Sequence, residues 1–133
     1  MLAWLRRLTS RPASGPLSGA PARRRVKNYA ALTGYAYEYL YAGYCDQGER
    51  REYVFTVSGD RKEWFALPVC LPGSALHAWE TAHGRTLAGN ERYALAKLAL
   101  FSAFDDRANP AALRAPIEVS ASQAAELLDR LEL

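Results

Sequence analysis

The stretch GYAYEYLYAGY, residues 34–44, places a tyrosine at every second position from Tyr35 to Tyr41 and another at Tyr44. Alternate side chains of a β-strand point to the same face of a sheet, whereas helical side chains repeat about every 3.6 residues. Aromatic residues are also favoured in strands. The stretch therefore predicts a strand with four phenol rings on one face, namely Tyr35, Tyr37, Tyr39 and Tyr41.

Two more alternating segments follow this strand, EYVFTVS at residues 52–58 and WFALPVCL at residues 64–71. Segments 45–51 and 58–63 between them hold glycine and charged residues, a composition typical of turns. Three strands joined by short turns predict an antiparallel meander. Pro68 has no N–H to donate, so we expect the third strand to lie at a sheet edge or to bulge there.

From residue 74 onward the apolar residues follow a helical spacing, and we expect helices over 74–83, 90–105 and 121–131. Ser120 is a suitable N-cap for the last of these helices. The segment PIEV at residues 116–119 is a candidate for a short fourth strand.

The helix over 90–105 carries apolar residues around nearly its whole circumference, which is typical of a buried helix. The large side chains that we expect in the core are Leu95, Leu98, Phe101 and Phe104. Together these patterns predict an α+β fold. Its antiparallel meander sheet has three or four strands and is covered on one face by the long apolar helix plus two shorter helices.

The charge is divided unevenly along the chain. The segment before Glu38 contains seven basic residues and no acidic residue, and the basic ones are Arg6, Arg7, Arg11, Arg23, Arg24, Arg25 and Lys27. Residues 38–133 hold ten basic and fourteen acidic residues. We therefore expect a disordered basic tail and linker over residues 1–27, with its cations available for phosphate groups, and a single globular domain over residues 28–133.

The first eight residues, MLAWLRRL, combine apolar and basic side chains. This combination favours a weak peripheral contact with an anionic membrane surface. No apolar run approaches the roughly 18 residues of a membrane span. We expect a cytoplasmic location. The alternative is an organelle if the source is eukaryotic, because basic, acid-free N-termini are typical of transit peptides.

Two interpretations of the tyrosine row remain open. In the first, the rings pave the sheet face that the long helix covers, with their hydroxyls reaching water or carbonyl groups at the rim. In the second, Tyr35, Tyr37, Tyr39 and Tyr41 form a binding surface. The ligand is then a protein partner, since tyrosine is enriched at interfaces, or single-stranded nucleic acid, whose bases stack on aromatic rings.

Motifs for catalysis and cofactor binding are absent from the sequence. It has no glycine-rich phosphate loop, dinucleotide-binding pattern or nucleophile elbow, and its cysteines and histidines lack metal-ligand spacing. A small thiol enzyme, with Cys70 beside His77, is an alternative, although an alternating strand position usually serves packing. We expect no metal and no cofactor.

The sequence therefore favours a non-catalytic accessory or adaptor module that binds a protein partner through its sheet edge or its tyrosine-rich face. An exposed sheet edge offers unpaired backbone groups to which a partner strand can add. The alternative of a different class is a single-stranded nucleic-acid-binding protein. It would use the basic N-terminal arm for phosphates and the tyrosines for stacking.

Overall fold

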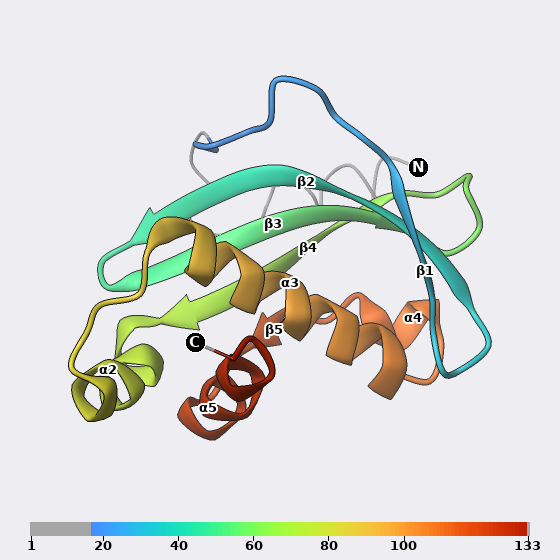
Figure 1. The fold of residues 1–133 in the computed structure, drawn as a ribbon. Helices are drawn as coiled ribbons and strands as arrows, with labels where there is room; N and C mark the ends of the chain where they lie inside the picture. The colour runs from blue at the N-terminus through green and yellow to red at the C-terminus, as the bar shows by residue number, and fades with distance from the viewer. Residues whose placement is uncertain (1–16, 133) are drawn as a thin grey trace.

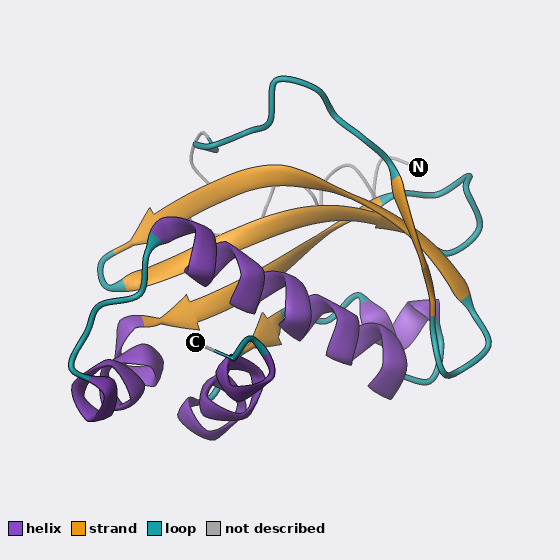
Figure 2. Cartoon of the chain, viewed as in Figure 1, coloured by secondary structure: helices purple, strands orange, loops and turns teal. Residues whose placement is uncertain are grey.

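The computed structural model describes residues 17–132 as an α+β fold in which helices pack against a curved five-stranded sheet (Figure 1 and Figure 2). Helices α2, α3 and α5 lie on one side of the sheet (Figure 1). The expectations for residues 1–16 lie outside the described residues. They include the membrane contact and the phosphate contacts of Arg6, Arg7 and Arg11.

The sheet has the order β1-β2-β3-β4-β5 and is mixed. Its first four strands pair antiparallel in sequence order, and they are β1 (Lys27–Ala30), β2 (Ala36–Gln47), β3 (Arg50–Ser58) and β4 (Phe65–Pro72). The last strand, β5 (Ile117–Glu118), pairs parallel with β4 at Val69 and Cys70. The sheet therefore has five strands rather than three or four, because β1, which the sequence did not predict, joins the three expected strands and the candidate strand at residues 116–119.

The sheet face that meets the helices is lined by aromatic rings. Tyr41 in β2 pairs with Phe55 in β3, and a β-bulge before Gly43 then shifts the register so that Tyr44 pairs with Tyr53. The ring centroids of Tyr44 and Tyr53 are 6.1 Å apart. The bulge therefore brings the fifth tyrosine onto the same face as the others, although its odd spacing alone would place it on the opposite face.

Four helices complete the described part of the fold: α2 (Gly73–His83), α3 (Gly89–Asp106), α4 (Pro110–Leu113) and α5 (Ala121–Arg130). The N-cap of α5 is Ser120, whose hydroxyl accepts a hydrogen bond from the Gln123 N–H at 3.1 Å, as its sequence predicts. Helix α3 lies across the ring-lined face of the sheet (Figure 1).

Two of the four α3 side chains expected in the core are less buried than the sequence predicts. Leu95 and Phe104 are 0% exposed, whereas Leu98 and Phe101 are only partly buried. Phe101 stacks on Tyr29 of the short edge strand β1, with ring centroids 4.6 Å apart. An edge strand of four residues leaves that side of the helix accessible to solvent.

Asp105 at the end of α3 connects the helix to the β1–β2 region. Its carboxylate accepts hydrogen bonds from the Tyr29 hydroxyl at 2.7 Å and from the Leu32 N–H at 2.9 Å. The hydrogen bond to this carboxylate, together with burial, raises the pKa of Tyr29 to about 12. These two contacts compensate for an acidic residue at a helix C-terminus, which the helix dipole disfavours.

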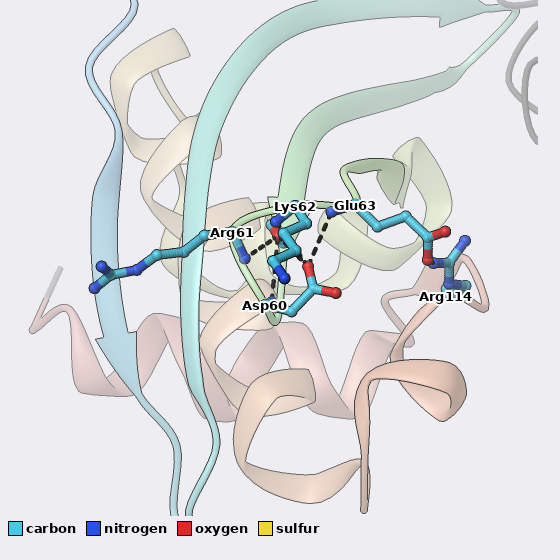
Figure 3. Close-up of polar contacts among 6 residues, drawn as sticks. Asp60, Arg61, Lys62, Glu63 and Arg114 are labelled. Carbon is cyan, nitrogen blue, oxygen red and sulfur yellow. Dashed lines mark hydrogen bonds and ion pairs between the residues drawn. The ribbon is translucent and has the colours of Figure 1, made fainter.

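The turn between β3 and β4 is organised by Asp60 (Figure 3). Its carboxylate accepts hydrogen bonds from the N–H groups of Lys62 and Glu63, both at 2.9 Å, and these bonds lower its pKa. Glu63 in turn forms an ion pair with Arg114 at 2.6 Å, which ties the turn to the segment after α4. The turn thereby holds Arg61 at a φ of 66°, a conformation unusual for a residue other than glycine.

The Glu91 side chain caps the start of helix α3, and this contact should make stability depend on pH. Glu91 accepts hydrogen bonds from the Arg85 guanidinium at 2.9 and 2.8 Å and from the Ala88 N–H at 2.8 Å, which lowers its pKa to about 2. A carboxyl with a depressed folded-state pKa stabilises the fold above its unfolded pKa. We therefore expect this contribution to be complete above about pH 4.5 and to be lost as the pH falls to about 2.

Urea unfolding of the wild type and Glu91→Gln at several pH values measures this effect. The wild type should be the more stable near pH 6, and the difference should shrink steadily between pH 4.5 and pH 2. A difference that stays constant over this interval would contradict the assignment.

Candidate functional site

A stretch of the β2 edge has no neighbouring strand. Strand β1 pairs with β2 as far as Tyr39, and Ser18 then pairs with Tyr44 through two backbone hydrogen bonds of 2.8 Å. Between these points, residues 40–43 have no strand partner on this side within residues 17–132. The segment 19–26 arches away from β2 here (Figure 1). Ala42 and Gly43 are buried, and Gly43 lies against Leu17 and Ser18, so the accessible part of this edge is at Leu40 and Tyr41 and could pair with only a short partner segment.

A pocket of about 210 Å³ lies beside this open edge. It is lined by the arch, by β2 and by the start of α3, and its residues are Pro21, Arg23, Arg25, Lys27, Tyr39, Leu40, Tyr41 and Tyr93. The lining includes no acidic residue. Within residues 17–132, its three cations form no ion pair. We refer to it as the arch pocket.

The arch pocket combines hydrogen-bond donors with positive charge. Burial raises the pKa of both Tyr41 and Tyr93, so these phenols stay protonated at neutral pH. Their rings meet edge to face, with centroids 4.8 Å apart. Burial lowers the pKa of Lys97 in α3, and the nearby Lys27 lowers it further. An acidic group is the ligand chemistry that fits this surrounding.

The predicted tyrosine row extends over more than one environment. Tyr37 is 0% exposed and Tyr39 is 5% exposed, so both rings belong to the core, although Tyr39 also reaches the arch pocket. Tyr41 is partly buried and lines the arch pocket. Tyr35 is 41% exposed and lines a different pocket, near Asp60. The row as a binding surface stays a prediction, and Tyr41 is its member most suited to contact a ligand.

The basic residues at the end of the expected tail occupy two kinds of position. Arg23, Arg25 and Lys27 line the arch pocket, whereas Arg24 is exposed and does not. The linker prediction did not include the pairing of Ser18 with Tyr44, which holds one end of the arch against the sheet.

Sequence reasoning missed Tyr93 as a member of the site. It lies in the first turns of α3, where the pattern suggested only a core helix. Its signal is visible in retrospect, because Tyr93 is the only tyrosine of the long helix and its hydroxyl needs a polar or solvated surrounding.

The thiol alternative gains no support from the position of Cys70. This residue is 1% exposed, and burial, followed by the charge of Glu118, raises its pKa to about 11. Such a thiol is neither ionised at neutral pH nor accessible. Within residues 17–132, no three histidine, cysteine or acidic side chains gather in a way that could hold a metal ion.

Comparison with known protein families, curated proteins and solved structures finds no match to this chain. In the part of the chain that the structure describes, no helix has the length and apolar character needed to cross a membrane.

Proposed function

We propose that this protein is a non-catalytic binding module that takes up an acidic, extended segment of a partner protein in the arch pocket. One observation carries this proposal: three cations that have no acidic partner among residues 17–132 flank a stretch of strand edge, residues 40–43, that has no neighbouring strand there. The partner's backbone would pair with β2, and its carboxylates would meet Arg23, Arg25 and Lys27.

Two further features support a peptide as the ligand. The open edge matches a short segment in length, because Tyr39 and Tyr44 are already paired on this side. The hydroxyls of Tyr41 and Tyr93 can donate to acidic side chains, while their rings supply apolar contact. Since the body of the protein is acidic overall, the pocket is also a local exception in charge.

The test uses a fluorescent peptide in which glutamate and valine alternate, Glu-Val-Glu-Val-Glu, with anisotropy as the readout. The double variant Arg23→Gln with Arg25→Gln should bind about tenfold more weakly, the effect of losing two exposed ion pairs. The matched control is Arg24→Gln with Lys62→Gln, which changes the net charge equally at exposed residues outside the pocket.

Hydrogen exchange distinguishes strand addition from a purely electrostatic contact. The bound peptide should slow amide exchange within residues 40–43, because a partner strand covers that edge. Equal losses of affinity in the two double variants, or no protection of this edge, would contradict the proposal.

A second candidate is a single-stranded nucleic-acid-binding protein that uses the same pocket. It is favoured by the proximity of the three cations to the rings of Tyr41 and Tyr93, which could stack on bases. A ten-nucleotide oligo(dT) tests it. Binding of this probe that exceeds peptide binding, falls steeply with salt and leaves residues 40–43 unprotected would replace the peptide proposal.

A further inference from the structure

The sheet face turned away from α2, α3 and α5 carries a second set of buried side chains (Figure 1). Val54 and Cys70 each lie between two residues of the helix-side core, so strand alternation turns them to the opposite face. Val54 is 7% exposed and Cys70 is 1% exposed, yet neither belongs to that core. Because the bare face of an antiparallel sheet is open to solvent, such low values indicate that this face is covered.

We refer to this side of the sheet as the outer face, and the residues that define it are Leu40, Cys45, Glu52, Val54, Cys70 and Glu118. Across it, the strand register places Glu52 between Cys45 and Cys70, and Glu118 beside Cys70. Glu52 is only 9% exposed. Acidic side chains at the centre of an apolar face favour a cover that combines apolar and basic groups.

The described chain begins beside the outer face. Ser18 pairs with Tyr44 at the β2 edge. A Cβ on Gly43, which is opposite Val54, would lie 2.9 Å from the Leu17 Cβ. Among residues 17–132, no helix lies over this face (Figure 1). The segment that precedes Leu17 therefore starts at the edge of a face that no described helix covers.

Residues 1–16 lie outside the described residues, but their sequence complements the outer face. Residues 1–8 contain no acidic residue, and their large apolar and basic side chains are Leu2, Trp4, Leu5, Arg6, Arg7 and Leu8. Residues 9–16, TSRPASGP, have the small and polar composition of a tether. Eight extended residues span up to about 26 Å. The three strand spacings from β2 to β5 amount to about 14 Å, so the tether is long enough.

We propose that residues 2–8 cover the outer face of the chain's own sheet, with their apolar side chains on Val54 and Cys70 and their arginines beside Glu52. The N-terminal segment is then an internal cover, in contrast to the disordered tail that its charge predicts. A membrane surface would have to displace it from the sheet. This inference is independent of the proposed peptide binding in the arch pocket.

Alkylation of the Cys45 and Cys70 thiols by iodoacetamide in the folded full chain tests the proposal, because both residues lie on the outer face. The double variant Leu5→Asp with Leu8→Asp places two charges in the apolar part of the cover. It should accelerate alkylation of both thiols about tenfold or more, by raising the population of the uncovered state. The matched control is Ser10→Asp with Ser14→Asp, which adds the same charge within the tether and should react as the wild type does. Amide protection of α3, on the other side of the sheet, should be retained in both variants.

A double-mutant cycle provides a second measurement that leaves the apolar contact intact. Arg6→Gln with Arg7→Gln should accelerate alkylation severalfold in the wild type and much less in Glu52→Gln, because the carboxylate beside the arginines is then already removed. In Glu126→Gln, which changes an exposed residue of α5, the two arginine substitutions should keep their full effect.

Three results would overturn the proposal. They are equal alkylation rates in the wild type and the leucine variant, equal effects of the arginine substitutions in the Glu52 and Glu126 backgrounds, and thiol protection that increases with protein concentration. The last result would assign the outer face to the N-terminal segment of a second copy.

Discussion

Replacing Phe104 with alanine is expected to lower the free energy of unfolding by about 3–5 kcal/mol, the usual cost of deleting a fully buried aromatic ring. The Phe104 side chain is 0% exposed. Its ring stacks on Tyr37 with centroids 4.8 Å apart, and it also contacts Tyr29 and Tyr39. Its removal therefore leaves a cavity between α3 and two strands, which the surrounding rigid rings cannot fill.

The matched control for this prediction is Phe101→Ala. Phe101 is partly buried and stacks on Tyr29, so its removal should cost about 1–3 kcal/mol, in proportion to the smaller apolar area that it buries. Urea unfolding of the three proteins measures the difference, provided that the dependence on urea concentration is unchanged. A larger loss for Phe101→Ala than for Phe104→Ala would contradict the described packing of α3.

The tyrosine row shows how much of the fold the sequence can predict. Alternation in residues 34–44 is a local property, and it correctly predicts a strand with its rings on one face, which the structure describes as β2. Burial is not local. Tyr37 and Tyr39 are buried because α3 lies over them, whereas Tyr35 extends beyond the helix-covered region and is 41% exposed.

The two strands beyond the three that the sequence clearly predicts are short: β1 was not predicted, and β5 was only a candidate within residues 116–119. Strand β1 has four residues and β5 has two, and neither is long enough to show a period. Each forms because a longer strand offers it a partner. The pairing of β5 with β4 is parallel, since the chain returns to β4 through three helices instead of a turn.

The arch pocket could not be predicted from sequence for a related reason. It joins Arg23 and Arg25 to Tyr93, which lies about 70 residues further along the chain. The residue types were visible as a basic tail and a tyrosine row, but their meeting depends on the arch and on the bulge in β2.

Replacing Gly43 with alanine is expected to have the second largest effect on stability, because this residue forms the bulge and also contacts the arch. Its φ is 130°, which side chains with a Cβ rarely adopt, and an added Cβ would lie 2.7 Å from the Ser18 carbonyl oxygen and 2.9 Å from the Leu17 Cβ. Backbone strain of this kind costs about 1–3 kcal/mol, and the overlap adds a similar amount.

Gly48→Ala separates backbone strain from overlap. Gly48 has a φ of 61° in the β2–β3 turn, but nothing lies within 4 Å of an added Cβ, so this variant should lose only about 1–2 kcal/mol. Amide exchange gives a second readout. The Tyr44 N–H donates to the Ser18 carbonyl oxygen at 2.8 Å, and its protection should fall in Gly43→Ala and persist in Gly48→Ala. Equal stability losses with intact Tyr44 protection in both variants would show that the arch is not held at Gly43. The unpaired stretch of the β2 edge would then not depend on the contact between Gly43 and the arch.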